Sequence, residues 1–191
     1  MYRYSWIWGK DTPTGFLNCA YKPLNTTEDI LVFSYNTIGS LSKNPIRYYP
    51  QGVKPVNITK RNNPNSKWRE NKGYSTGGNK LNSDTEYIQK FRGYPSNILQ
   101  FARNKNAVHP TQKPVALLEY LIKTYTQENQ LVLDNTMGSG STGVAYMHTN
   151  RRFIGIEFNP EKDRQGSYKE PDKYFKHAKE RIEKAHEDSN R

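Results

Sequence analysis

The stretch LVLDNTMGSGSTGVAY combines an apolar run, an acid and three closely spaced glycines. The apolar run ends at Asp134, and Gly138, Gly140 and Gly143 follow it before a helix-forming segment. Glycines let the backbone turn sharply and approach a ligand closely, and the N–H groups at the start of a helix favour an anionic group. Glu157 ends the next apolar run, where a carboxylate can accept hydrogen bonds from ribose hydroxyls. This spacing predicts a site for an adenosine-containing cofactor.

NAD and S-adenosylmethionine both fit that much of the pattern. Asp134 favours S-adenosylmethionine, because a carboxylate directly before the loop repels a pyrophosphate but suits an ammonium and a sulfonium. The methionine carboxylate then needs donors, which Thr111, Lys113 and the start of a nearby helix can supply. The predicted cofactor-binding residues are Thr111, Lys113, Asp134, Thr136, Met137, Gly138, Ser139, Gly140, Ser141, Thr142, Glu157 and Phe158.

Hydrophobic periodicity indicates the elements that must position these residues. Residues 9–15 read as a loop, and the run at 29–35 is apolar enough to be buried on both faces. The strands expected at 130–134 and 152–157, with the helix expected at 141–148 between them, predict a βαβ unit with a parallel sheet. The carboxyl edge of this sheet carries Asp134 and Glu157. Strands are predicted at 2–8, 29–35, 130–134 and 152–157, and helices at 109–126, 141–148 and 171–187. The apolar stripes of the first and last helices are Val115, Leu118, Leu121 and Ile122, and Tyr174, Ala178, Ile182 and Ala185.

The net charge of +11 is concentrated in one third of the chain. Residues 40–105 contain 13 basic and three acidic side chains, whereas the flanking parts are nearly neutral. Such a segment predicts a polyanionic partner. Because it is rich in Asn, Gly, Pro and Ser and has no helical period, it also predicts an inserted, mostly irregular module.

Other features of the composition narrow the class of protein. No apolar run approaches the length that spans a bilayer, and the first residues lack the blocks of a signal peptide. Cys19 is the only cysteine, and the four histidines are scattered. We therefore expect a cytoplasmic protein without an intrachain disulfide or a metal site.

Four segments, in the order HPTQKP, VLDNTMGSGSTGVA, RRFIGIEFN and YFKHAKERI, closely resemble the amino-DNA methyltransferases of the permuted β type. In that family the cofactor motifs follow the catalytic and DNA-recognition parts. The segments YSWIWGK, TGFLNCAYKPLNTTEDILVFSYN and GYPSNIL are similar to the later strands and the recognition-region ends of phage and bacterial adenine methyltransferases.

The resemblance implies an α/β, Rossmann-like, S-adenosylmethionine-dependent methyltransferase fold in three parts. Residues 1–39 would be later strands of the sheet, 40–105 a target-recognition insert, and 106–191 the cofactor-binding part. The implied reaction is methylation of an exocyclic amine in double-stranded DNA, at N6 of adenine or N4 of cytosine, as in restriction–modification systems. Overall likeness leans to adenine, although charge alone does not exclude RNA, and a protein target also stays open.

Within the implied recognition insert, the candidates for phosphate or base-edge contacts are Lys60, Arg61, Lys67, Arg69, Lys72 and Arg92. Trp68 and Tyr74 are equally consistent with base stacking and with a small local core.

The catalytic motif of the family does not occur in these 191 residues. That motif is an acidic or polar residue, two further residues that are usually Pro-Pro or Leu-Pro, and an aromatic. In relatives it lies on a central strand, so the resemblance also implies a sheet whose two halves are not joined here. We therefore predict no catalytic residue in the chain. Several interpretations of the chain stay open. It can be an incomplete, N-terminally truncated copy, one half of a split enzyme whose separate chain carries the motif, or a non-catalytic DNA binder, and a homodimer is also open.

Overall fold

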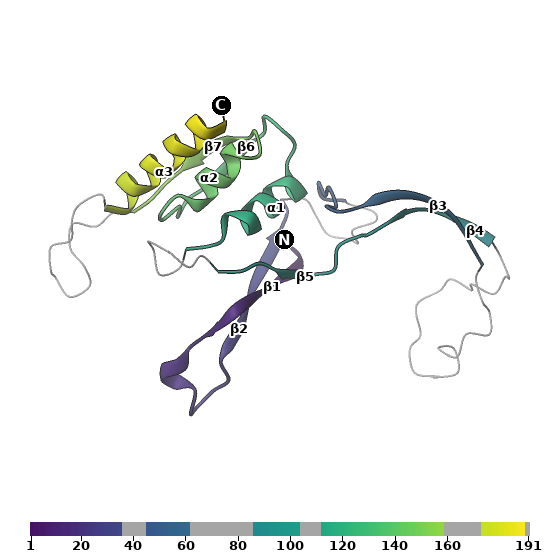
Figure 1. Cartoon of the computed structure of the whole chain (residues 1–191), viewed down its shortest axis with the longest axis horizontal. Coiled ribbons are helices and arrows are strands. Elements are labelled where there is room, and N and C mark those ends of the chain that lie inside the picture. The colour runs from purple at the N-terminus through teal and green to yellow at the C-terminus, as the bar shows by residue number, and fades with distance from the viewer. Residues whose placement is uncertain (36–44, 62–85, 104–111, 159–172, 190–191) are drawn as a thin grey trace. The chain divides into compact units, whose positions relative to one another are not determined.

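The computed structural model describes residues 1–35, 45–61, 86–103, 112–158 and 173–189. These fall into two compact units, one of residues 1–51 with 96–191 and one of residues 52–95. Ile46 and Tyr48, which lie within the predicted insert, pack in the first unit beside Trp6. The elements are shown in Figure 1.

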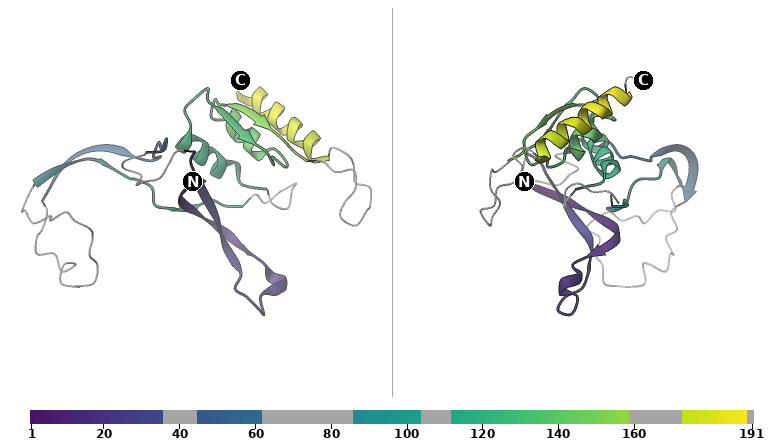
Figure 2. Two further views of the ribbon diagram at one scale, coloured as in Figure 1. Left: turned by 180° about the vertical axis from the view of Figure 1, so that it is seen from behind. Right: turned by 60° about the vertical axis from the view of Figure 1, so that its left-hand side comes forward.

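A long antiparallel hairpin opens the first unit. Strand β1 (Tyr2–Thr14) pairs with β2 (Asn25–Phe33), and a short 3-10 helix, η1 (Phe16–Asn18), lies between them. Figure 2 shows this hairpin as a twisted ribbon that ends in η1. The prediction of a loop at 9–15 is wrong up to Thr14, because an irregularity in the register between Gly9 and Thr14 accommodates Pro13 within the strand. Strand β5 (Ile98–Gln100) pairs in parallel with β1 and completes the order β2-β1-β5.

Helix α1 (Val115–Tyr125) packs on one face of this sheet. The alternation of β1 turns Trp6 and Trp8 towards Leu117 of the helix, and all three are buried. The most buried apolar residue of α1 is Leu117, which the predicted stripe omits. The prediction that 29–35 is buried on both faces is also wrong. Ile30 and Val32 pack in the core, whereas Leu31 and Phe33 point the other way and are more than half exposed.

The predicted βαβ unit is confirmed. Strands β6 (Leu131–Asp134) and β7 (Arg152–Gly155) are parallel, and helix α2 (Ser141–Met147) connects them. Tyr146 of α2 stacks on Phe153 of β7 with ring centroids 4.8 Å apart. Strand β7 is two residues shorter than expected, so Glu157 lies just beyond its end.

Helix α3 (Lys173–Ser189) packs against α2, and the two lie next to each other in Figure 1. Ala178 and Ala185 of its predicted stripe are fully or almost fully buried. The 171–187 helix prediction is therefore confirmed with a shift of two residues at each end.

The second unit contains an antiparallel ribbon of β3 (Lys54–Arg61) and β4 (Glu86–Arg92). For these residues the prediction of a mostly irregular module is wrong. Val56, Ile58, Tyr87, Ile88 and Phe91 supply the β-branched and aromatic residues that favour strands.

The described residues form three separate sheets, β2-β1-β5, β3-β4 and β6-β7. No described strand joins β6–β7 to β1–β2. Among the described residues, no helix has the length and apolar character needed to cross a membrane.

Candidate functional site

The loop after β6 is folded between the ends of the two parallel strands. The Asp134 carbonyl accepts the Ile156 N–H at 2.8 Å, and the Ile156 carbonyl accepts the Met137 N–H at 3.0 Å. The Asp134 carboxylate oxygen Oδ1 accepts the Thr136 N–H at 3.0 Å. Asp134 therefore ends its strand with the side chain held at the carboxyl edge of the sheet, as the spacing predicts.

Glu157 closes the other side of this loop. Its Oε2 accepts the backbone N–H of Gly138 at 2.6 Å, and Gly138 adopts a positive φ of 53°. The carboxylate thus fixes the loop with one oxygen, and its second oxygen can accept a ligand hydroxyl. Two acids from neighbouring strand ends meet around one short loop.

Gly140 packs closely against helix α3. Its φ is 76°, and a Cβ built there would lie 2.8 Å from the Ala178 Cβ and 2.9 Å from the Ala178 Cα. A Cβ on Gly143 would similarly meet Ile182 at 2.2 Å. The close approach at these glycines is therefore that of α3, and only Gly138 of the three glycines lines the pocket described below.

Arg181 of α3 holds the loop by hydrogen bonds to Ser139 and Ser141. Its Nη1 donates to the Ser139 carbonyl at 2.6 Å and to the Ser139 and Ser141 hydroxyls at 3.1 and 3.4 Å. Burial lowers the pKa of the Arg181 guanidinium from its usual value. Sequence reasoning missed this residue, because a charged position next to a helical apolar stripe reads as an ordinary surface cation.

The segment before α1 reaches the same loop. The Ser139 hydroxyl donates to Gln112 Oε1 at 3.1 Å. The neighbouring Lys113 places its ammonium 2.6 Å from Glu28 Oε2 and 5.6 Å from the centroid of the Trp8 ring. Lys113 therefore contacts the β1–β2 hairpin, and the adjacent Gln112 contacts the loop.

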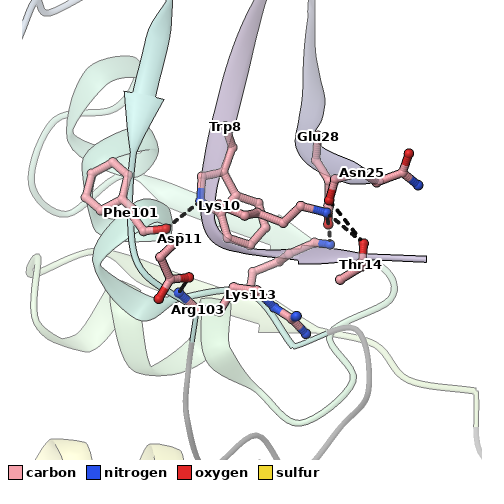
Figure 3. A network of polar contacts seen from close by, with 9 residues as sticks. All are labelled: Trp8, Lys10, Asp11, Thr14, Asn25, Glu28, Phe101, Arg103 and Lys113. Carbon is pink, nitrogen blue, oxygen red and sulfur yellow. Dashed lines mark hydrogen bonds and ion pairs between the residues drawn. The ribbon is translucent and has the colours of Figure 1, made fainter. Parts of the chain in front are cut away.

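Glu28 is shared by two lysines. Lys10, whose side chain is only 4% exposed, lies with Nζ 3.4 Å from Glu28 Oε1 and also donates to the Thr14 hydroxyl. Figure 3 shows the ammonium groups of Lys10 and Lys113 next to the Glu28 carboxylate. Burial raises the pKa of Glu28, but the hydrogen bond and charge of Lys113 and then of Lys10 outweigh it, so this pKa lies below its usual value. The carboxylate is therefore ionised at neutral pH.

The loop after β6, the start of α2, Glu157 and the segment that leads into α1 line a pocket of about 460 Å³. This volume is within the size range of small-molecule sites. Of the predicted cofactor residues, Gly140 and Phe158 do not line it, and Thr111 lies outside the described residues. Phe158 is 83% exposed. Two lining residues were not predicted: Gln112, within the HPTQKP segment, and Leu118, on the predicted stripe of α1. The lining residues are Gln112, Lys113, Leu118, Asp134, Thr136, Met137, Gly138, Ser139, Ser141, Thr142 and Glu157.

The predicted nucleic-acid residues fall in the second unit. Lys60 and Arg61 lie at the end of β3, and Arg92 lies at the end of β4. Lys67, Arg69 and Lys72, with the stacking candidates Trp68 and Tyr74, lie outside the described residues.

A family model described as DNA methylase matches residues 2–170. The chain belongs to the N6-adenine/N4-cytosine DNA methylase family. Membership confirms the predicted resemblance to amino-DNA methyltransferases, and with the βαβ unit it confirms the Rossmann-like methyltransferase fold. The permuted order of the parts stays a prediction. The chemistry of the pocket agrees with this methylase family, because acids from two strand ends and a lysine can hold an adenosine, an ammonium and a carboxylate in one ligand.

Individual relatives match parts of this methylase chain. The type II methyltransferase M.HpaI of Haemophilus parainfluenzae is 38% identical over 102 residues, which are 50% of this chain and 29% of that protein. The type II methyltransferase M2.DpnII of Streptococcus pneumoniae is 42% identical over 79 residues, or 41% of this chain and 25% of that protein. The crystal structure of the M1.HpyAVI–SAM complex superposes with a TM-score of 0.48 and 26% identity, covering 95% of this chain and 62% of that one. The matches to the two curated relatives span less than a third of their length.

Proposed function

We propose that this chain supplies the cofactor-binding and DNA-recognition parts of a DNA methyltransferase that acts in the cytoplasm. The donor is S-adenosylmethionine, and the acceptor is an exocyclic amine of double-stranded DNA, N6 of adenine. The observation that carries the proposal is the pocket in which Asp134, Glu157 and Lys113 come together from three segments. S-adenosylmethionine supplies a methyl group on a positively charged sulfur, which makes that carbon electrophilic.

The roles of the pocket residues follow from their charges. Glu157 has one oxygen bound to the Gly138 N–H, and its other oxygen accepts from the ribose hydroxyls. Asp134 holds the ammonium of the methionine part. Lys113, with Thr111 two residues before it in the sequence, binds the methionine carboxylate.

Calorimetric titration of the purified chain with S-adenosylmethionine and with NAD tests the cofactor assignment. We expect binding of S-adenosylmethionine and none of NAD, because the pyrophosphate would lie against the Asp134 carboxylate. Tight binding of NAD without S-adenosylmethionine would overturn the assignment.

The proposed reaction needs the catalytic motif that the 191 residues lack. We propose that a strand of a separate polypeptide carries this motif and pairs with β2 at the edge where no other described strand is paired. Along this edge runs a groove of about 430 Å³, lined by residues 30–34, Ile46, Arg47 and two residues of α1, Leu121 and Tyr125. An unpaired edge beside alternating apolar side chains is the feature that binds an added strand.

One face of β6–β7 has no covering layer among the residues that the structure describes, and this face supports the same proposal. Leu131, Leu133 and Ile154 lie on it and are each about half exposed or more, whereas parallel sheets are normally covered on both faces. The M.HpaI and M2.DpnII sequences extend far beyond the matched region, so further polypeptide to cover such a face exists in these relatives.

Tritium transfer from labelled S-adenosylmethionine to DNA tests this requirement. We expect transfer only when a polypeptide carrying the motif is co-expressed with the chain. Leu31→Asp and Leu133→Asp should abolish that rescue, whereas Leu17→Asp, at a 99% exposed position on η1, should not.

Efficient transfer by the chain alone would refute the need for a partner. A dimer in sedimentation experiments whose formation both aspartate variants prevent would instead assign the surface to a second copy.

A further inference from the structure

The β3–β4 ribbon has two chemically different faces. Directly opposite residues of an antiparallel pair share a face, and successive residues alternate between faces. The register pairs Lys54 with Arg92, Arg61 with Glu86, and Lys60 with Tyr87. The basic face therefore carries Lys54, Thr59, Arg61, Glu86, Ile88, Lys90 and Arg92.

The opposite, aromatic face carries Pro55, Ile58, Lys60, Tyr87, Gln89 and Phe91. Lys60 is its single charged residue, whereas the basic face has four cations and one acid. The register thus separates charge from aromatic surface, a division that the composition of the segment does not reveal.

Side chains of both faces are open to solvent. Ile88 on the basic face is 61% exposed, and Tyr87 and Phe91 on the aromatic face are each 46% exposed. A two-stranded ribbon is only marginally stable in water without a covering layer or a partner. The exposed side chains of the ribbon are therefore available to bind a partner.

We infer that the basic face of β3–β4 lies in the major groove of duplex DNA, with the aromatic face turned away. This inference rests on the proposed function, in which DNA is the substrate. The major groove admits a two-stranded ribbon, and lysines and arginines that neutralise phosphates supply most nonspecific affinity. Bases in an intact duplex are stacked on one another, so Tyr87 and Phe91 have no open base face to contact there.

The described cations predicted from the sequence to contact DNA lie on different faces of the ribbon. Arg61 and Arg92 face the DNA together with Lys54 and Lys90, which are not among the cations predicted from the sequence. Lys60 faces away, although it is adjacent to Arg61 in the sequence. Lys60 is therefore a matched control, since it has the same charge and lies on the same ribbon.

Fluorescence anisotropy with a labelled 30-base-pair duplex, measured at several KCl concentrations, tests the orientation in the full chain. Lys90→Ala and Arg92→Ala should each weaken binding by about three- to tenfold and lower the slope of log K against log [KCl] by about 0.9 per lost phosphate contact. Arg92→Lys should keep the slope. Lys60→Ala and the pair Tyr87→Ser with Phe91→Ser should change affinity less than twofold.

Three results would overturn the inference. The first is a slope change for Lys60→Ala equal to that for Arg92→Ala. The second is loss of binding by the Tyr87/Phe91 pair with Lys90→Ala and Arg92→Ala unaffected, which would assign the aromatic face to unstacked bases. The third is no binding of duplex DNA by the wild-type chain, or tighter binding of duplex RNA, which would also remove DNA from the proposed function. The first two results leave cofactor binding in calorimetry, and hence the proposed function, intact.

Discussion

Replacing Gly140 with alanine should destabilise the chain through two separable effects. The backbone there is left-handed, with φ at 76°, which costs a residue with a Cβ about 1–2 kcal/mol. The added Cβ would also lie 2.8 Å from the Ala178 Cβ and 2.9 Å from its Cα. Neither atom can rotate away, so α3 must shift, at a cost of about 1–3 kcal/mol. We therefore expect a loss of about 2–5 kcal/mol in the free energy of unfolding.

Urea unfolding of four variants separates the two effects. Gly15→Ala is the control for the backbone effect alone, because Gly15 has φ at 94° and a Cβ placed on it would have nothing within 4 Å. This variant should lose only about 1–2 kcal/mol in the free energy of unfolding. Ala178→Gly should cost about 1 kcal/mol as a helix substitution. Its combination with Gly140→Ala should cost less than the sum of the two, because the Cβ–Cβ contact is gone. Equal losses for Gly140→Ala and Gly15→Ala, or strict additivity of the double variant, would refute the assigned contact with α3.

Three further substitutions address the pocket and the core. Asp134→Asn should weaken the binding of S-adenosylmethionine about tenfold in calorimetry. It should leave the binding of 5′-methylthioadenosine nearly unchanged, because that ligand lacks the amino-acid part. Equal losses of affinity for both ligands would contradict the assigned role. Glu28→Gln should cost about 1–3 kcal/mol at pH 7, because Lys10 stays buried beside a neutral amide. Since the pKa of Glu28 is lowered in the folded chain, the difference in unfolding free energy is fully present above the unfolded pKa and should vanish as pH falls through the folded pKa. An unfolding difference in urea that does not change with falling pH would argue against the ion pairs. Leu117→Ala should cost about 2–5 kcal/mol, and a loss below 1 kcal/mol in urea unfolding would place it outside the core.

The sequence predicted the cofactor half of the first unit well because its signals are local. An apolar strand, glycines at fixed steps and an acid after the next strand are contiguous, and they produced β6, α2 and β7 with Asp134 and Glu157 at one edge. The contribution of Gly140 to packing was missed, since the partner, Ala178, is far away in sequence.

Long-range pairing explains the other errors. β2 reads as a doubly buried strand because Ile30, Leu31, Val32 and Phe33 are consecutive and apolar, but one face of its sheet has no covering layer among the described residues. The β3–β4 ribbon is formed by strands that residues 62–85 separate in the sequence, so no short hairpin signal marks it. The Glu28 link to Lys10 and Lys113 likewise depends on residues that the sequence places far apart.

The shared carboxylate of Glu28 makes pocket occupancy and hairpin order linked equilibria. Lys113 lines the pocket and binds Glu28 on β2, and Glu28 in turn holds the buried Lys10 of β1. A ligand anion that draws Lys113 towards itself would leave Glu28 with Lys10 as its described cationic partner, and would remove one contact between the pocket and the first two strands. By thermodynamic reciprocity, a molecule that binds those strands and changes the affinity of the pocket for its ligand has its own affinity changed by the ligand by the same factor.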